Sequence, residues 1–297
     1  MTRKVLILGG TGQVGRALKR LSWPADVGLA VPARADLDLT DAEAVRRRIG
    51  QGGYAAVVNA AAYTAVDRAE RERDVAFAVN GVAPGVLADA AATADAVLIH
   101  LSTDYVFDGR AGRPYDEDDA PAPLNVYGAS KLAGERAVLE AQPQATVMRT
   151  SWIVGPDGNN FLTTMLRLAG ERAAIDVVDD QTGRPTAASE VARAAQTVLL
   201  RRLDDPTAPG GLLHFAGAGQ ATWADLARSV LDASRARGGP HAEVRPIATR
   251  AYPTPARRPA DTRLATGRIT RDYGVRPRPW DETVAEIVAE RLKGAGA

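Results

Sequence analysis

A chain of 297 residues is long enough for one large domain or two closely packed ones. Its 37 basic and 36 acidic residues lack the basic excess typical of a non-specific nucleic-acid binder, and the absence of cysteine excludes disulfides and thiolate sites. The apolar run at residues 5–8 is too short for a signal peptide core of roughly 7–15 residues, and no uninterrupted apolar stretch reaches the roughly 18 that span a bilayer. We therefore expect a cytoplasmic protein that binds neither nucleic acid nor membrane.

Short apolar strands alternate with helices through the first half of the chain. Thr40 and Glu43 match a capping box, which predicts that a helix begins there. The alternation indicates parallel strands joined by right-handed crossovers. Because the strands are continuously apolar, we expect an α/β fold with a doubly wound parallel sheet of the Rossmann type, covered by helices on both faces. The predicted strands are 5–8, 27–31, 55–58, 96–101 and 146–149, and the predicted helices are 13–21, 40–48, 66–79, 83–93 and 128–141.

The second half of the chain has longer loops, rich in Gly, Pro, Asn and Arg, at 155–160 and 181–186. Three prolines in 252–259 exclude a regular element there. We expect a dinucleotide-binding domain at 1–150 and a smaller, mixed substrate-binding region at 151–297, with some segments returning to pack on the first domain. Helices are predicted at 161–168, 190–200, 223–233 and 283–292.

The turn after the first predicted strand carries Gly9, Gly12 and Gly15 and opens a helix. Glycines let the turn fold tightly and let its backbone approach a pyrophosphate, which the N–H groups of a helix N-terminus favour. The second strand ends in Pro32-Ala33-Arg34, without the acidic residue typical of NAD sites. Arg34 is either a solvated loop residue or a partner for the 2′-phosphate of NADP. The expected cofactor is NADPH or NADH, and Arg34 slightly favours NADPH.

Tyr127 and Lys131 are four residues apart on a predicted helix, so their side chains return to the same face. A nearby ammonium favours the phenolate and lowers the pKa of tyrosine from about 10, which makes it a usable acid or base. Thr103 follows the fourth strand, where its hydroxyl can hydrogen-bond a substrate carbonyl. A Tyr-x-x-x-Lys pair alone is common on surface helices. In this order and context, the three residues predict the catalytic set of a nicotinamide-dependent ketoreductase.

Longer runs of sequence resemble the dTDP-4-dehydrorhamnose reductases, a family of extended short-chain dehydrogenases/reductases. The family catalyses the last step of dTDP-L-rhamnose synthesis, so the resemblance implies reduction of the C4 ketone of dTDP-4-dehydro-β-L-rhamnose, a dTDP-linked keto sugar. The matching runs are 11–15, 58–67, 102–107, 123–128, 131–135, 149–152, 158–161, 181–186 and 251–259.

The resemblance also implies roles for individual residues. Tyr127 would be the proton donor, Lys131 its partner, and Thr103 the residue that tunes proton transfer and touches the sugar. The cofactor-binding residues that it implies would be Gly12, Gln13, Val14, Asp38, Leu39, Ala62, Tyr63, Thr64, Tyr127 and Lys131, in addition to Gly9, Gly15 and Arg34 from the glycine turn and the second strand. The substrate-binding residues would be Thr103, Asp104, Trp152, Asn159, Asn160 and Arg257, with Arg258 as a further nucleotide contact.

Some family members dimerise through a magnesium ion held by glutamates, one of them on the first helix. Residues 16–20 of this chain offer no carboxylate there, and its histidines lack metal-binding spacing. We therefore expect no metal and either a monomer or a homodimer. Two other functions stay open: reduction of another dTDP-4-keto deoxysugar, and a non-catalytic, NADP-binding regulatory subunit of the methionine adenosyltransferase type. The complete Tyr127, Lys131 and Thr103 set argues against the latter.

Overall fold

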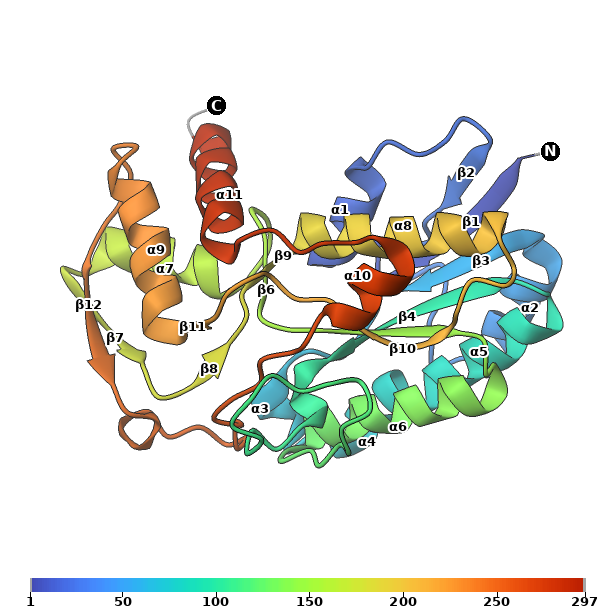
Figure 1. The fold of residues 1–297 in the computed structure, drawn as a ribbon, viewed down its shortest axis with the longest axis horizontal. Coiled ribbons are helices and arrows are strands. Elements are labelled where there is room, and N and C mark those ends of the chain that lie inside the picture. Colours follow the sequence, from blue (N-terminus) through green and yellow to red (C-terminus); the bar gives the residue numbers. More distant parts are fainter. Residues whose placement is uncertain (1, 296–297) are drawn as a thin grey trace.

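The computed structural model, which describes residues 2–295, contains a central sheet of six parallel strands (Figure 1). Their order is β10-β5-β4-β3-β1-β2, which confirms the predicted doubly wound α/β fold. The chain leaves β1 toward β2 on one side and returns to β3 on the other. Ligands bind beyond the carboxyl ends of strands at such a reversal. The strands are β1 (Arg3–Leu8), β2 (Val27–Ala30), β3 (Tyr54–Asn59), β4 (Val97–Thr103), β5 (Thr146–Thr150) and β10 (Gly211–His214).

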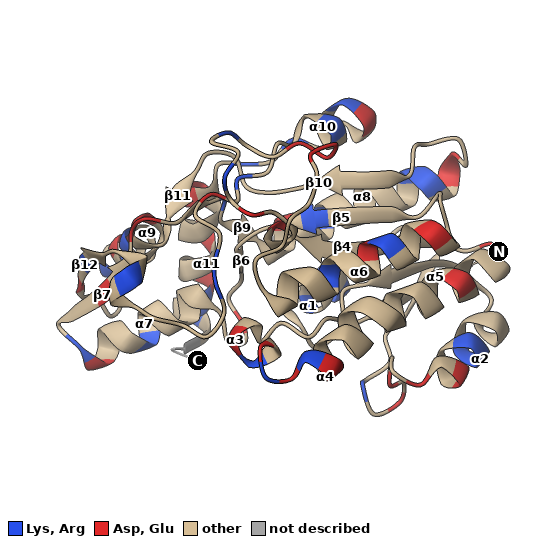
Figure 2. Cartoon of the chain, turned by 90° about the horizontal axis from the view of Figure 1, so that it is seen from below, with Lys and Arg blue, Asp and Glu red and all other residues tan. Residues whose placement is uncertain are grey.

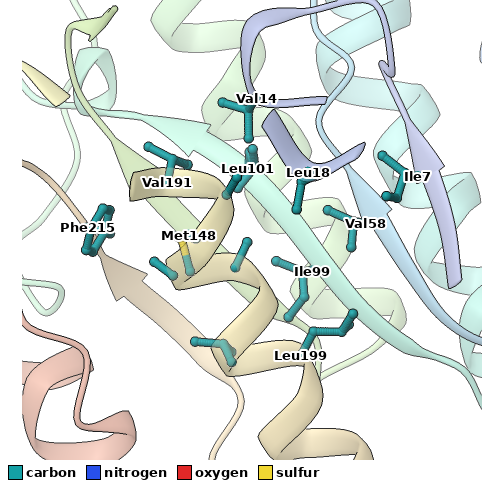
Figure 3. Packing of buried hydrophobic residues seen from close by; sticks show 14 of the residues in the cluster. Ile7, Val14, Leu18, Val58, Ile99, Leu101, Met148, Val191, Leu199 and Phe215 are labelled. Atoms are coloured by element: carbon teal, nitrogen blue, oxygen red, sulfur yellow. The ribbon is translucent and has the colours of Figure 1, made fainter. Parts of the chain in front are cut away.

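Helices cover both faces of this sheet. One face packs against α1 (Gln13–Arg20) and α8 (Ala188–Asp204), and Figure 3 shows α8 lying across the strands. The other face packs against α2 (Ala42–Gly52), α5 (Ala83–Thr93) and α6 (Val126–Ala141). Alternate residues of each strand serve the two cores, because successive side chains point to opposite faces. The short helices of the first half are α3 (Val66–Ala69), α4 (Arg73–Phe77), the π-helical turn η1 (Ala78–Val82) and the 3₁₀ turn η2 (Asp104–Val106).

A second, smaller core lies beside the sheet, away from α2 and α5 (Figure 1). It is formed by helices and by two short parallel strands that pair with each other rather than with the central sheet. Its main elements are α7 (Phe161–Glu171), β7 (Ala174–Val178), α9 (Trp223–Arg235), β12 (Glu243–Ile247) and α11 (Trp280–Ala295). Shorter elements of this half are β6 (Ile153–Val154), β8 (Thr182–Gly183), β9 (Thr186–Ala187), β11 (Ala221–Thr222), the 3₁₀ turn η3 (Thr249–Ala251) and α10 (Gly267–Tyr273).

Three segments from the second half, α8, β10 and α10, pack on the central sheet or its helices. Strand β10 extends the sheet beyond β5, where the sequence pattern ended the series of strands. We propose that the dinucleotide-binding unit consists of residues 1–150 together with these three segments. The remaining part of 151–297 would then form the substrate-binding unit.

Two local predictions are wrong. The cap of α2 is Asp41, whose side chain accepts a hydrogen bond from Ala44 N at 3.0 Å. Thr40 instead donates its hydroxyl to Asp38 at 2.8 Å, so the predicted Thr40–Glu43 capping box does not form. The single helix predicted over 66–79 is broken between α3 and α4 and continues as a π-helical turn.

One helical stretch, Arg73–Thr93, is long and apolar enough to cross a membrane by length and composition alone. Half of its apolar window is buried inside the structure, where α5 packs against α2 and α6. The core helix of a globular protein passes the same test. In the cartoon of Figure 2, acidic and basic residues are interspersed along the helices and loops.

Candidate active site

The glycine turn joins β1 to α1 at the carboxyl edge of the sheet. Gly9 has a φ of +78°, and a side chain on it would clash with the backbone after β3, since a Cβ would lie 2.6 Å from Ala60 C. Gly12 is the N-cap of α1 and has no side chain to satisfy the first amides of the helix. A buried oxygen of Gln13, Oε1, has no hydrogen-bond partner among the described residues. Unpaired amides at a helix N-terminus favour an anion, so this turn fits a dinucleotide pyrophosphate.

Val14 and Gly15, the other predicted cofactor contacts of the turn, differ in what they contribute to its structure. The Val14 side chain is buried in the core under α8, which leaves only its backbone facing the edge of the sheet. Gly15 lets α1 approach the turn closely, because a Cβ there would lie 2.1 Å from Gly9 O.

The loop after β2 places Arg34 and Asp38 close together on the surface. Both side chains are exposed. The pKa of Asp38 is lowered mainly by hydrogen bonds from Thr40, and the charge of Arg34 contributes to the lowering. Leu39 is half-buried against the core under α2. An exposed guanidinium here is accessible to a phosphate, while the Asp38 carboxylate is already engaged locally.

The segment after β3 runs along the same edge of the sheet. Tyr63 N donates to Asn80 Oδ1 at 2.8 Å, and its hydroxyl donates to Glu72 at 2.7 Å. Ala62 is half-buried and Thr64 is exposed. The hydrogen bond to Asn80 of η1 therefore fixes the backbone of this segment.

Helix α6 begins two residues earlier than predicted, and its N-cap, Asn125, accepts a hydrogen bond from Gly128 N at 2.8 Å. Tyr127 consequently lies in the first turn of the helix, half-buried, with its phenol near enough to the Thr103 side chain for Thr103 to lower its pKa. Strand β4 extends two residues further than predicted and includes Thr103. The structure thus brings two of the three predicted catalytic side chains together at the carboxyl end of β4.

Burial raises the pKa of Tyr127 to about 12, and the nearby Thr103 side chain only partly opposes this. The expected lowering by Lys131 is absent, because its Nζ turns away to donate to Leu101 O at 2.7 Å. The lysine is 2% exposed, and burial lowers its own pKa to about 8. A phenol with a raised pKa is protonated at neutral pH and is suited to donate a proton.

Two buried polar atoms at the ends of β4 and β5 have no hydrogen-bond partner among the described residues. They are Asp104 Oδ2 and Thr150 Oγ1. Thr103 and Thr150 are neighbours in the paired strands, and Asp104 directly follows Thr103. Burial raises the pKa of Asp104 to about 7, so its carboxyl can donate or accept a hydrogen bond near neutral pH. Buried polar groups are rarely left unpaired, so their gathering here indicates a polar ligand.

Trp152 follows β5 with a φ of +44°, a backbone conformation that is strained for a bulky residue. Its ring stacks on Trp223 of α9 with centroids 3.6 Å apart and planes 7° from parallel. A Cβ on Gly183 would lie 2.3 Å from the Trp152 ring, so the ring lies closely over that backbone. Backbone strain of this kind gathers at ligand sites. Trp223 had no signal in the sequence, because it lies on a helix far along the chain.

The two arginines of the 252–259 loop have different surroundings. Arg258 forms an ion pair with Asp67 of α3 at 2.8 Å. Arg257 is exposed, and its side chain takes part in no hydrogen bond or ion pair within residues 2–295. Its carbonyl accepts a hydrogen bond from Asn125 at 2.8 Å, which ties the loop to the start of α6. Of the pair, Arg257 is therefore the one available for a ligand.

The predicted asparagine contacts lie at the start of α7. Asn160 caps the helix by accepting from Thr163 N at 3.1 Å, and its amide donates to Gly155 O and Asp157 O. Asn159 is exposed. The structure gives Asn160 a capping role, and contact of either residue with a nucleotide stays a prediction.

A buried ion pair beneath the site was missed by sequence reasoning. Arg149 of β5 and Glu135 of α6 are each 2% exposed and 2.6 Å apart. Ser102 donates to the same carboxylate at 2.5 Å, and Arg149 also lies over the Phe107 ring.

Within residues 2–295, no group of three or more His, Asp or Glu side chains is placed to hold a metal ion.

The fold and the site define an oxidoreductase of the extended short-chain dehydrogenase/reductase type. The sequence model described as the RmlD substrate binding domain matches residues 3–292. The chain therefore belongs to this family, that of the dTDP-4-dehydrorhamnose reductases, as its motifs predicted.

Relatives are similar over nearly the whole chain. The dTDP-4-dehydrorhamnose reductase of Sinorhizobium fredii is 41% identical, covering 99% of this chain and 100% of its own. The dTDP-4-dehydrorhamnose reductase of Mycolicibacterium smegmatis is 44% identical, and the match covers 97% of this chain and 86% of that protein. The crystal structure of a Bacillus anthracis dTDP-4-dehydrorhamnose reductase in complex with NADP has a TM-score of 0.89 at 33% identity, covering 98% and 100%. A Streptomyces venezuelae dTDP-glucose 4,6-dehydratase, 21% identical with a TM-score of 0.79, shares the fold.

Proposed function

We propose that this chain reduces the C4 ketone of dTDP-4-dehydro-β-L-rhamnose to dTDP-L-rhamnose with NADPH or NADH. The observation that carries the proposal is the meeting of Thr103 and Tyr127 at the carboxyl end of β4, with Lys131 one turn along α6. The glycine turn lies at the same edge of the sheet. Membership of the reductase family supports the choice of substrate.

The chain's own residues would handle the proton of the reaction. A nicotinamide cofactor, when bound, would supply the hydride for the ketone carbon. Tyr127, protonated at neutral pH, would donate its proton to the carbonyl oxygen as negative charge develops there. Thr103 would orient that oxygen. The Lys131 ammonium, which donates to Leu101 O in the structure, would turn toward the phenolate once the proton has left and would stabilise it. Trp152, Asp104, Asn159 and Arg257 are proposed to hold the sugar nucleotide.

The turn at Gly15 gives a test of cofactor binding. Gly15→Ala is expected to raise the Kd for NADPH more than tenfold, about 1.4 kcal/mol, because the added Cβ meets Gly9 backbone at 2.1 Å and displaces α1. Isothermal titration calorimetry checks this. Gly50→Ala is the matched control: a Cβ there meets nothing within 4 Å, so cofactor affinity stays unchanged. Equal affinity in the Gly15 variant would show that the turn does not hold the cofactor.

Arg34 is expected to select between the two cofactors. Charge-assisted hydrogen bonds contribute about 1.5–3 kcal/mol, so Arg34→Ala should lower kcat/KM for NADPH at least about tenfold and leave that for NADH nearly unchanged. Steady-state kinetics with both cofactors measure the ratio. Arg245→Ala, an exposed arginine on β12, is the control. An unchanged ratio would assign Arg34 to the solvated surface.

The choice of substrate is tested with a panel of purified dTDP-4-keto sugars. We expect the highest kcat/KM for dTDP-4-dehydro-β-L-rhamnose. A higher value for another dTDP-4-keto deoxysugar would move the assignment to that sugar. Absence of any turnover, together with co-purification with a methionine adenosyltransferase, would support the regulatory-subunit alternative.

A further inference from the structure

Beneath Lys131 lies a buried chain of polar groups that the proposed reduction does not require. Nζ of Lys131 is 3.4 Å from Nε2 of His100, and the other ring nitrogen, Nδ1, is 3.0 Å from Nδ2 of Asn59. Asn59 and His100 are 1% and 0% exposed. They are register partners in β3 and β4, so their side chains lie on the same face of the sheet, the one that α6 covers.

The orientation of the Asn59 amide determines which nitrogen of His100 carries the proton. Asn59 Oδ1 accepts a hydrogen bond from Ala61 N at 3.1 Å, so Nδ2 is the atom that faces the ring. Because Nδ2 can only donate, His100 Nδ1 must accept. Burial and the charge of Lys131 hold the pKa of His100 well below its ordinary value, so the ring is neutral and has one proton. That proton lies on Nε2, the atom facing Lys131.

An N–H aimed at Nζ distinguishes between the two charge states of a lysine. An ammonium has no lone pair and cannot accept a hydrogen bond from the His100 N–H, so two donors would face each other. A neutral amine has a lone pair and accepts this hydrogen bond. We propose that Asn59 and His100 are positioning residues for Lys131, which disfavour its ammonium relative to its amine by holding the His100 Nε2–H against Nζ. The inference builds on the catalytic role proposed above for Lys131.

The other ionisable groups near Lys131 act differently. The Glu135 carboxylate, on the next turn of α6, raises the pKa of Lys131, but Arg149 of β5 is paired with that carboxylate. Tyr127 on α6 and Asp104 after β4 lie on the side of the active site. Burial raises the pKa of Tyr127 to about 12, so its phenol is neutral at pH 7, and raises that of Asp104 to about 7, so its carboxyl is partly ionised there. Burial lowers the pKa of Lys131 to about 8 in spite of Glu135, and the proposed contact with His100 would act in the same direction as burial.

The tautomer can be measured in the wild-type protein without substrate. The chain has three histidines, so the ring ¹⁵N signals can be assigned with single His→Gln variants. His214 is an internal contrast, because its Nδ1 lies 3.2 Å from Tyr115 O and must donate there. We expect the Nε2–H tautomer for His100 and the Nδ1–H tautomer for His214. An Nδ1–H tautomer at His100 would overturn the proposal, whether or not the protein reduces a keto sugar.

The same signals report the charge of Lys131. The Nε2 shift of His100 is expected to titrate with a midpoint near pH 8. A midpoint at the ordinary lysine value of about 10.4 would overturn the proposal. Neither measurement depends on turnover, so their failure is distinguishable from failure of the proposed function.

The variant Asn59→Asp tests whether the polar groups Asn59 and His100 affect the reaction through Lys131. The variant is isosteric, and one carboxylate oxygen can still accept from Ala61 N while the other accepts from His100 Nδ1–H. His100 Nε2 then becomes an acceptor for the ammonium, and a negative charge is added. Because the phenolate of Tyr127 needs the ammonium, activity falls as pH rises through the lysine pKa. We expect the alkaline limb of the kcat–pH profile to move up by about one unit or more. An unmoved limb, in a variant whose His100 tautomer has switched, would contradict a role in catalysis.

Discussion

Tyr127→Phe is expected to lower kcat for keto-sugar reduction by about 10²- to 10⁴-fold, the usual contribution of a positioned acid. The substitution removes only the phenol oxygen, whose pKa the nearby Thr103 side chain lowers. The ring keeps its edge-to-face packing on Tyr105, with centroids 5.9 Å apart, so the fold and the cofactor Kd should change little. Steady-state kinetics, with calorimetric titration of the cofactor, separate the loss of chemistry from a loss of binding.

Tyr273→Phe is the matched control for this experiment. Tyr273 lies at the end of α10, and its hydroxyl donates to Pro209 O just before β10, away from the carboxyl end of β4. We expect wild-type kcat from it. Near-wild-type turnover in the Tyr127 variant would mean that another group supplies the proton.

Arg149→Met is expected to lower the free energy of unfolding by about 3–5 kcal/mol, the typical cost of leaving one partner of a buried ion pair uncompensated. Both members of the Arg149–Glu135 pair are 2% exposed, and in the variant only Ser102 still donates to the carboxylate. The double variant Glu135→Leu with Arg149→Met should recover much of that loss, because no buried charge then remains. Urea unfolding followed by circular dichroism measures all three proteins.

An exposed ion pair provides the comparison. Arg167 and Glu171 on α7 are 2.8 Å apart, with side chains 61% and 52% exposed. Arg167→Met should therefore cost at most about 1 kcal/mol. A loss at Arg149 no larger than this would show that the buried pair does not hold α6 onto β5.

The elements that the sequence predicted well are those with strong local signals. The four-residue apolar run of β1 followed by a glycine turn has few alternatives, and the structure places strand and helix there. The α2 cap was wrong because Thr40 and Asp41 are both good caps, and the choice depends on Asp38 engaging Thr40 first. Strand β10 is only four residues long, and its place in the sheet depends on pairing with β5, which no local pattern records.

The candidate site shows the same division. Tyr127, Lys131 and Thr103 stood out by motif and order, and the structure places Tyr127 and Thr103 in contact. The effect of Lys131 on Tyr127 was wrong, because a spacing of four residues shows a shared face but not how deeply each group is buried. Trp223 and His100 touch predicted site residues from distant segments, so only the fold reveals them.

The most direct test of the central claim is a single assay of NADPH and NADH oxidation by the purified protein with dTDP-4-dehydro-β-L-rhamnose, followed by NMR of the product. We expect stoichiometric cofactor oxidation, formation of dTDP-L-rhamnose, and loss of both in Tyr127→Phe. Absence of oxidation with either cofactor, in a protein that binds NADPH, would contradict the account.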